Sequence, residues 1–377
     1  MSQVKGLKEQ IIAGSAIQNL EFFIQWHLTE RCNLSCRHCY QGGKRTPEMT
    51  VGELKREIDG AAEMFAAWKD EGISVVPSIH FTGGEPFLFR DLWEGIAHAR
   101  QRGFDAALMS NGILITDEDA GKTRAWDVFD VQISLEGPAP VHDRIRGPGS
   151  FRGALRGAKR LIAAGTRVSA NVTLSRVNIR NVKETIGIAK DTGFNSIGFS
   201  RIVPCGRGRE LLDFLLAPEE VRDAYEQAFG LSDAGFSVVS GDPLAGVVRG
   251  VRPPADCRLT LSGCSAGFSG VTITSDGTVM ACRRIGLKAG NLRKKSLREI
   301  WATSPLLWKL RRRESYRGKC GTCDLWPTCR GCRAVSYAFS SARGKADLFA
   351  DDPQCWLHGR GQDGPSGRHP GKHSNPP

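Results

Sequence analysis

No apolar run in the sequence approaches the roughly 18 residues that a membrane-spanning helix requires. The first residues, 1–8, also lack the apolar stretch of a secretory signal peptide. Twelve cysteines in a chain without such a signal indicate metal or redox chemistry in a reducing cytoplasm rather than disulfides. We therefore expect a cytoplasmic protein with no membrane partner.

The sequence also lacks basic–aromatic interleaving and any helix-turn-helix pattern, which argues against a nucleic-acid partner. The formal net charge of +12 would suit an anionic partner, but only residues 311–313 form a tight basic run. A content of 40% hydrophobic and 24% charged residues is ordinary for a globular protein, and 377 residues suffice for a large core plus an appendage.

Three closely spaced cysteines follow a strand-like run at residues 22–28. Cys32, Cys36 and Cys39 have the spacing C-x3-C-x2-C. Three thiolates on one short loop can hold three corners of an iron–sulfur cube and leave the fourth iron open to a small molecule. Structural zinc loops usually pair C-x2-C units and close the fourth position, so the triplet suits zinc poorly.

Strand-like and helix-like segments alternate after the triplet. This spacing predicts parallel βαβ units with right-handed crossovers, six of them rather than the eight of a closed barrel. We predict an incomplete, TIM-like (β/α)6 barrel over residues 22–235, preceded by an N-terminal extension over residues 1–21. The later strands are expected at residues 74–81, 106–109, 128–135, 167–174 and 196–202, and helices at 51–69, 91–102, 150–165 and 181–192, with one more after Thr116.

Polar and glycine-rich residues collect where these strands end, the place where parallel α/β folds carry their sites. After the second strand, Gly83 and Gly84 would let the backbone approach a ligand, and Glu85 could accept hydrogen bonds from an ammonium group. Taken alone, this segment could equally be a plain turn. Further polar candidates at or after the strand ends are Ser110, Asn111, Ser134, Glu136, Arg146 and Asn171.

The composition changes in the second half of the chain. Residues 271–280 alternate on both sides of Asp276 and Gly277, which predicts a β-hairpin. Eight thiols form two sets of four, enough for two fully ligated 4Fe–4S clusters, although two zinc sites would fit the spacing as well. The eight are Cys257, Cys264, Cys282, Cys320, Cys323, Cys329, Cys332 and Cys355.

The triplet with Tyr40, together with the Gly-Gly-Glu-Pro segment, resembles the signature of the radical S-adenosylmethionine (SAM) enzymes, and the second half resembles the SPASM domain. The resemblance covers roughly residues 22–356 and implies a SPASM domain with a hairpin and short helices over 236–358. This sequence departs from the family pattern at Glu136, where an aspartate is usual, and at the spacer before Cys332, which has two residues where many members have three. The tail, 359–377, is expected to be disordered.

The resemblance implies three 4Fe–4S clusters and SAM as cofactors. Cys32, Cys36 and Cys39 would hold the cluster whose open iron chelates SAM. Residues expected to line SAM are Tyr40, Gly83, Gly84, Glu85, Pro86, Ser110, Asn111, Ser134, Glu136, Arg146 and Asn171. In the SPASM arrangement the first auxiliary cluster would take Cys257, Cys264, Cys282 and Cys332, and the second would take Cys320, Cys323, Cys329 and Cys355.

The resemblance also implies an activity, the reductive cleavage of SAM to a 5′-deoxyadenosyl radical that abstracts hydrogen from a substrate. We expect a maturase of a ribosomally made peptide that forms a crosslink or inverts a stereocentre. Cys205 belongs to neither cysteine set, and it could donate a hydrogen atom to a substrate radical or be an inert small residue.

Three other functions stay open. Residues 26–34 resemble the peptide-modifying branch and equally the branch that modifies tetrapyrrole side chains in haem synthesis. A sulfatase-type protein maturase ranks third. A non-catalytic iron–sulfur electron-transfer protein is the alternative outside enzymes, and the Gly-Gly-Glu-Pro segment argues against it because an electron carrier needs no SAM pocket.

The expected partners are a peptide substrate and an electron donor such as flavodoxin or ferredoxin. Only 21 residues precede the first predicted strand, too few for a winged-helix leader-binding domain. We therefore expect a leader peptide to be presented by a separate protein or bound by the basic surface of the barrel.

Overall fold

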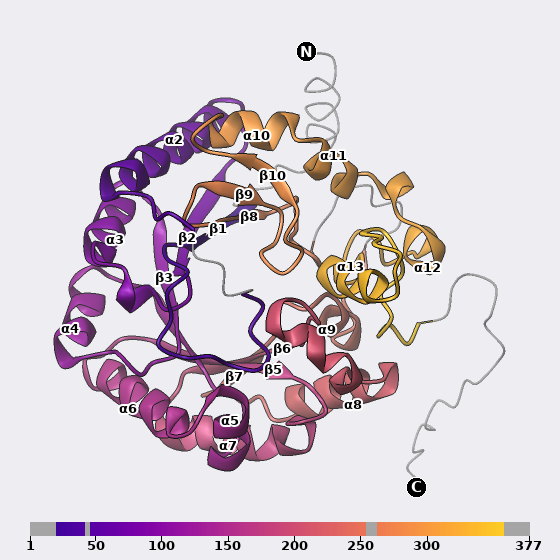
Figure 1. Ribbon diagram of the computed structural model, residues 1–377, viewed down its shortest axis with the longest axis horizontal. Helices are drawn as coiled ribbons and strands as arrows, with labels where there is room; N and C mark the ends of the chain where they lie inside the picture. Colours follow the sequence, from indigo (N-terminus) through magenta and orange to yellow (C-terminus); the bar gives the residue numbers. More distant parts are fainter. Residues whose placement is uncertain (1–19, 42–45, 254–261, 358–377) are drawn as a thin grey trace, which may run out of the picture.

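The computed structural model describes residues 20–41, 46–253 and 262–357 (Figure 1). The predicted tail and Cys257, as well as almost all of the predicted N-terminal extension, lie outside the described residues. Within them, no helix is long and apolar enough to cross a membrane.

One ten-stranded sheet organises the chain, in the order β10-β9-β8-β1-β2-β3-β4-β5-β6-β7. All neighbours from β8 through β1 to β7 pair in parallel, which confirms the predicted barrel-type fold. The strands are β1 (Leu20–His27), β2 (Val75–Thr82), β3 (Asp105–Ser110), β4 (Asp130–Ser134), β5 (Val168–Leu174), β6 (Ser196–Arg201), β7 (Ser237–Val239), β8 (Gly270–Ile273), β9 (Thr278–Met280) and β10 (Lys288–Asn291).

Helices form an outer ring around the strands when the molecule is viewed down the barrel (Figure 1). Those of the barrel are α2 (Val51–Asp70), α3 (Leu92–Gln101), α4 (Asp117–Ala125), α5 (Ala139–Arg146), α6 (Ser150–Ala163), α7 (Val182–Thr192), α8 (Pro218–Phe229) and α9 (Pro243–Val248). The second half carries the short helices α10 (Leu297–Thr303), α11 (Pro305–Arg311), α12 (Gly318–Thr322) and α13 (Arg333–Ala342). The helices α5, α8 and α9 and the strands β7 and β10 were not predicted.

Local sequence signals explain where the helices begin. The predicted capping box at α2 is present, because Thr50 accepts from the Glu53 amide and Glu53 accepts from the Thr50 amide at 2.8 Å. A second box, from Thr116 and Asp119, opens α4. Each box satisfies amide groups that have no partner within the first helical turn.

The outer face of β1 packs on helices from both halves of the chain. The Phe22 ring lies 5.1 Å from Phe65 of α2 and 4.9 Å from Trp301 of α10, centroid to centroid. Side chains alternate along a strand, so Gln25 and His27 face the inside of the barrel. There Gln25 contacts the Met109 sulfur of β3.

The predicted hairpin forms between β8 and β9, and β8 also pairs with β1. The second half of the chain therefore continues the barrel sheet instead of standing beside it. The strand β7 follows the predicted boundary at residue 235 and extends the sheet at its other edge. The division of the chain at that residue stays a prediction.

The carboxyl end of β6 is tied to the second half by a buried charge network. The Arg201 guanidinium donates to Asp242 at 2.7 Å and to Asp352 at 2.8 and 2.9 Å, and all three side chains are nearly or fully buried. Gln354 accepts a further hydrogen bond at 3.0 Å.

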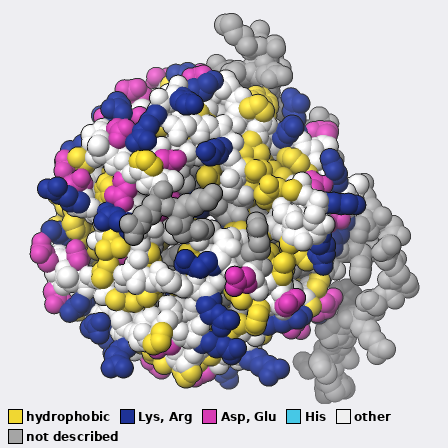
Figure 2. All heavy atoms as spheres, viewed as in Figure 1, with side chains coloured by type: hydrophobic (Ala, Val, Ile, Leu, Met, Phe, Trp, Pro, Cys, Tyr) yellow, Lys and Arg dark blue, Asp and Glu magenta, His cyan; other side chains and the backbone are white. Residues whose placement is uncertain are grey.

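On the surface, Lys and Arg side chains lie interspersed with Asp and Glu around the face shown (Figure 2).

Candidate functional site

The cysteine triplet lies on the loop after β1, at the carboxyl end of the barrel strands. Cys32 is exposed, Cys36 is buried and Cys39 is half-buried. Hydrogen bonds to other segments hold this loop in place. The Arg37 amide donates to the Ile145 oxygen of α5, and Arg207 donates from its amide to the Cys39 oxygen and from Nε to the Cys36 oxygen. Burial raises the pKa of the Cys32 thiol to about 11, and the nearby Cys36 and Cys39 add to that rise.

The Gly-Gly-Glu-Pro segment packs directly on the chain that leads into the triplet. The Gly84 amide donates to Thr29 at 2.7 Å and the Glu85 amide donates to Arg31 at 2.8 Å. A Cβ atom on Gly84 would lie 2.1 Å from the Arg31 carbonyl oxygen, and one on Gly83 would lie 2.5 Å from the Thr29 oxygen. The glycines are therefore required for contact with the chain's own backbone. Pro86 begins the short 3-10 turn that follows.

Glu85, Ser110 and Asn111 come together beside Cys32. The fully buried Glu85 carboxylate accepts from the Ser110 hydroxyl at 2.8 Å and from the Asn111 amide at 2.9 Å. Burial raises its pKa to about 7, against these hydrogen bonds, which lower it. The Asn111 side chain donates to Asn33 at 2.8 Å and lies 4.0 Å from the Cys32 sulfur.

Glu136 forms a second buried carboxylate centre. It accepts from Arg146 at 2.6 and 2.9 Å, from the Thr173 amide at 2.9 Å, and lies 3.1 Å from His38 Nε2. Burial alone would raise the pKa of Glu136, but Arg146 and His38 outweigh burial and lower it well below its usual range. Arg146 Nη1 also lies 3.9 Å from the Cys36 sulfur, so this pair sits against the triplet.

The remaining predicted SAM-lining residues lie nearby on the strands and the triplet loop. Ser134 and Asn171 stand opposite each other in the β4–β5 register. The Tyr40 ring is held at 5.9 Å from the His27 ring, edge to face, and burial raises the pKa of Tyr40.

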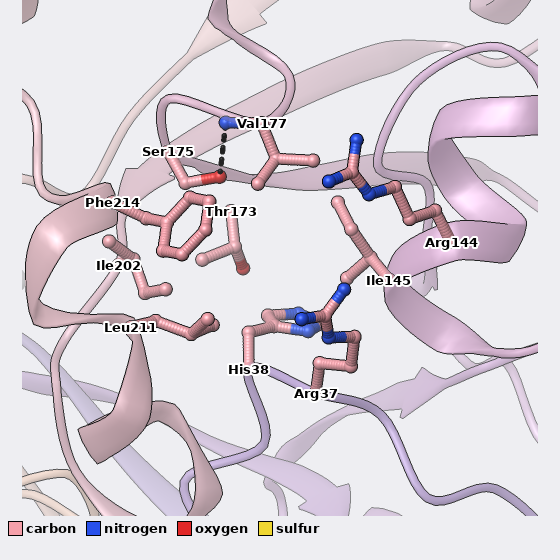
Figure 3. A pocket seen from close by; sticks show the side chains of 10 residues that line it. All are labelled: Arg37, His38, Arg144, Ile145, Thr173, Ser175, Val177, Ile202, Leu211 and Phe214. Atoms are coloured by element: carbon pink, nitrogen blue, oxygen red, sulfur yellow. Dashed lines mark hydrogen bonds between the residues drawn. The ribbon is translucent and has the colours of Figure 1, made fainter.

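A small recess opens between the triplet loop, α5, the end of β5 and the 3-10 segment η3 (Gly206–Phe214) (Figure 3). Ile202, Leu211 and Phe214 form one side of it, with Arg144 and Ile145 on the opposite side (Figure 3). The full lining is Arg37, His38, Arg144, Ile145, Thr173, Ser175, Val177, Ile202, Leu211 and Phe214. Arg37 and His38 lie inside the cysteine triplet, whereas Ile202, Leu211 and Phe214 belong to no motif, which is why sequence reasoning missed them.

His27 and Arg283 were also missed. His27 is fully buried, yet neither of its ring nitrogens makes a well-formed hydrogen bond within the described residues. Burial and Arg283 lower the pKa of His27 to about 3. Arg283 pairs with Glu30 at 2.9 Å while its Nε lacks a partner in that same part of the chain. Strand alternation, which turns His27 inward beside the triplet loop, is the signal that could have found it.

The second predicted cysteine set surrounds one recess. Cys320, Cys323, Cys329 and Cys355 line this recess together with Lys319 and Arg330. In the described part of the chain, no three His, Cys, Asp or Glu side chains are close enough to hold a single metal ion. The fit of an iron–sulfur cube here rests on the chemistry of four thiols around one space.

The first predicted set is gathered elsewhere. Cys332 packs in a separate small core with Cys264, Cys282 and Cys205. The turn between Cys329 and Cys332 explains this separation, since its two residues, Arg330 and Gly331, both adopt left-handed backbone angles, with φ of 66° and 63°. The short spacer thereby turns neighbouring cysteines toward different centres.

Cys205 lies between the triplet and the first set. Burial raises its pKa to about 11, with Arg284, Cys282, Cys39 and Arg283 among the charged groups that act on it. Its thiol is therefore neutral near pH 7, as a hydrogen-atom donor would have to be.

Comparisons with known proteins agree with this geometry. The model of the radical SAM superfamily matches residues 26–189, and the model of the SPASM iron–sulfur cluster-binding domain matches residues 264–333.

Two curated relatives span most of the chain. An AdoMet-dependent heme synthase of Nitratidesulfovibrio vulgaris is 31% identical over 349 residues, covering 88% of this chain and 91% of that protein. The mycofactocin maturase MftC of Mycolicibacterium smegmatis is 33% identical over 342 residues, covering 88% and 82%.

Solved structures share the fold at low identity. Streptococcus suis SuiB bound to S-adenosylmethionine superposes with a TM-score of 0.71 at 17% identity, covering 94% of this chain and 81% of SuiB. Native anSMEcpe with bound AdoMet gives 0.66 at 18% identity, covering 87% and 94%.

Proposed function

Because the chain belongs to the radical SAM superfamily and carries a SPASM iron–sulfur domain, we propose that this enzyme matures a ribosomally made peptide by abstracting hydrogen from it. The observation that carries the catalytic part is the convergence of Glu85, Ser110 and Asn111 beside Cys32. A protein that only transfers electrons does not require a buried carboxylate beside its cluster-binding cysteines.

Each residue of this centre has a role in holding SAM. Cys32, Cys36 and Cys39 hold a 4Fe–4S cluster, which on reduction supplies a 5′-deoxyadenosyl radical from bound SAM. Glu85 accepts hydrogen bonds from the ammonium group of SAM, and Ser110 and Asn111 fix the carboxylate for that contact. The buried setting of these groups excludes water from the reacting centre.

Arg146, Ser134 and Asn171 face the carboxylate and ribose of SAM, while Glu136 and Tyr40 shape that side of the site. Arg146 is oriented for this role by its two hydrogen bonds to Glu136.

The two further cysteine sets hold two more 4Fe–4S clusters, giving three in all. The four thiols around one recess support this for the second set. The protein works in the cytoplasm with an electron donor such as flavodoxin or ferredoxin, and a separate protein presents the leader peptide. Cys205, near Cys39 and Cys282, is the residue placed to return a hydrogen atom if the product is an epimer.

A peptide substrate is supported by the similarity to the mycofactocin maturase and by the fold shared with SuiB, which has been solved with a precursor peptide. The second candidate is a tetrapyrrole, supported by the 31% identity to the heme synthase over nearly its whole length. A sulfatase-type maturase remains third.

The first experiment measures 5′-deoxyadenosine from anaerobically reconstituted protein with dithionite and SAM. We expect product from the wild type and from Ser35→Ala, a matched change on the same loop, and none from the variant with Cys32, Cys36 and Cys39 changed to Ala. Iron should approach about twelve atoms per chain, three cubes of four. Zinc in place of iron after reconstitution would contradict the proposal.

The substrate is tested by adding, separately, the peptide encoded beside this protein and an iron tetrapyrrole with propionate side chains. Faster 5′-deoxyadenosine formation and a mass change in the peptide support the main proposal. The same response confined to the tetrapyrrole would assign the second function.

A further inference from the structure

Two buried arginines flank the turn that separates the cysteine sets. Arg330 and Arg333 expose only 2% and 0% of their surface. Neither forms an ion pair with a carboxylate within the described residues, and the Nε atom of each has no hydrogen-bond partner there. Buried charge that is not cancelled locally acts strongly on its neighbours.

Arg333 reaches the sulfur of a predicted ligand. Its Nη2 lies 3.6 Å from Cys320 Sγ, and its Nη1 donates to the Ala350 oxygen at 2.7 Å. The guanidinium also lies over the Tyr316 ring, 5.1 Å from the centroid. Carbonyl and ring contacts fix the position of the guanidinium, and Asp352 acts on its charge without forming an ion pair with it.

Arg330 itself lines the recess. Its Nη2 donates to the Cys264 oxygen at 2.8 Å, its Nη1 donates to the Pro327 oxygen at 3.1 Å, and it stacks over Phe268 at 4.3 Å. Lys319 adds a third cation at the recess, where its Nζ donates to the Cys355 oxygen at 2.7 Å.

Two carboxylates oppose this positive field. Asp351 Oδ1 accepts from the Cys320 amide at 2.9 Å. Asp352 pairs with Arg201 at 2.8 Å, and its charge also acts on Cys320, Cys329 and Cys355.

We propose that Arg333 and Arg330 raise the reduction potential of the cluster held by Cys320, Cys323, Cys329 and Cys355, so that it takes up an electron readily. A cube on four thiolates is negative and becomes more so on reduction, and nearby buried cations stabilise the more negative form. This inference rests on the proposed function, which places a cluster at that recess.

The test is a redox titration followed by electron paramagnetic resonance (EPR) spectroscopy. The protein used carries Ala at Cys32, Cys36 and Cys39, so that the auxiliary clusters alone contribute, and the signal lost on Cys320→Ala identifies the cluster in question. Arg333→Gln should lower its midpoint potential and Asp351→Asn should raise it. Arg317→Gln, a control with its side chain 75% exposed, should leave it unchanged.

Opposite shifts are the decisive result, because a disturbed fold would not move the potential upward in one variant and downward in the other. If Arg333→Gln loses its iron, the midpoint potential of Asp351→Asn still tests the inference. Arg333→Lys keeps the positive charge, so its midpoint potential should lie closer to that of the wild type than the potential of Arg330→Gln does. Shifts of one sign, or none in Asp351→Asn, overturn the inference while leaving the cluster in place. A wild type with no EPR signal that depends on Cys320 would instead overturn the cluster assignment itself.

Discussion

The two cysteine-bearing regions of this enzyme differ in access and in the charged groups beside them. The triplet starts at the exposed Cys32, and the buried carboxylates Glu85 and Glu136 lie beside it together with Arg146 and Arg207. Three cysteines of the second half, Cys320, Cys329 and Cys332, are buried, and both arginines and aspartates act on them. A site that must admit a small molecule stays open, whereas a permanently held group suits a closed setting.

The largest effect is expected from a substitution at Gly84, which packs against the backbone that leads to Cys32. Gly84→Ala would drive a Cβ atom into the Arg31 backbone, so the loop that leads to Cys32 must move. We expect SAM cleavage to fall by about 100-fold, because small displacements of catalytic groups cost rates of that order. Gly60→Ala in α2, with nothing within 4 Å of the added atom, is the control. Equal activity of the two variants would show that the close contact is not required.

Breaking the junction between the regions should cost stability. Arg201→Met leaves Asp242 and Asp352 buried without their partner, and we expect about 3–5 kcal/mol lower free energy of unfolding in urea. Arg222→Met removes an exposed pair and should cost less than about 1 kcal/mol. Similar losses in both variants would mean that the network does not join the regions.

The pH dependence of stability should distinguish the two carboxylates of the open site. Glu85 has a pKa of about 7, raised by burial, so between about pH 4.5 and 7 the folded protein binds a proton that the unfolded chain releases. In metal-free protein the free energy of unfolding should therefore fall as pH rises through this window, by on the order of 2–3 kcal/mol relative to Glu85→Gln. The depressed pKa of Glu136 acts in the opposite sense, since its stabilisation is lost as pH falls.

Urea unfolding of wild type and Glu85→Gln at pH 5, 6, 7 and 8 measures this difference. Parallel stability curves would contradict a raised pKa for Glu85. With SAM present, ionised Glu85 should also make binding tighter at pH 8 than at pH 6.

The smallest effect is expected between the regions, at Cys205. Cys205→Ser should change 5′-deoxyadenosine formation by less than about twofold, because hydrogen return follows the cleavage of SAM. If the product is an epimer, its formation should fall sharply, and deuterium from solvent should no longer appear in it. A large drop in SAM cleavage would indicate instead that Cys205 supports the triplet loop.

Local sequence patterns were enough for much of this protein. The six barrel strands, the capping box at Thr50 and the hairpin at Gly277 all follow from short-range spacing and turn chemistry, whereas the division of the later cysteines into two sets came from the resemblance to the SPASM domain. Such features depend on residues a few positions apart, which a sequence displays directly. The convergence of Glu85 and Asn111 was also foreseeable, because parallel strands end at one edge.

Other features became visible only in the tertiary structure. The pairing of β8 with β1, the Arg201 network and the approach of Arg333 to Cys320 join residues far apart in the chain. Even for His27, whose inward orientation alternation predicts, the lack of a well-formed side-chain hydrogen bond within the described residues is visible only when its neighbours are in place. The sequence by itself determined the cofactor chemistry, through closely spaced cysteines and glycines. Packing decided which charges surround each site, because burial and long-range contacts have no local pattern in the sequence.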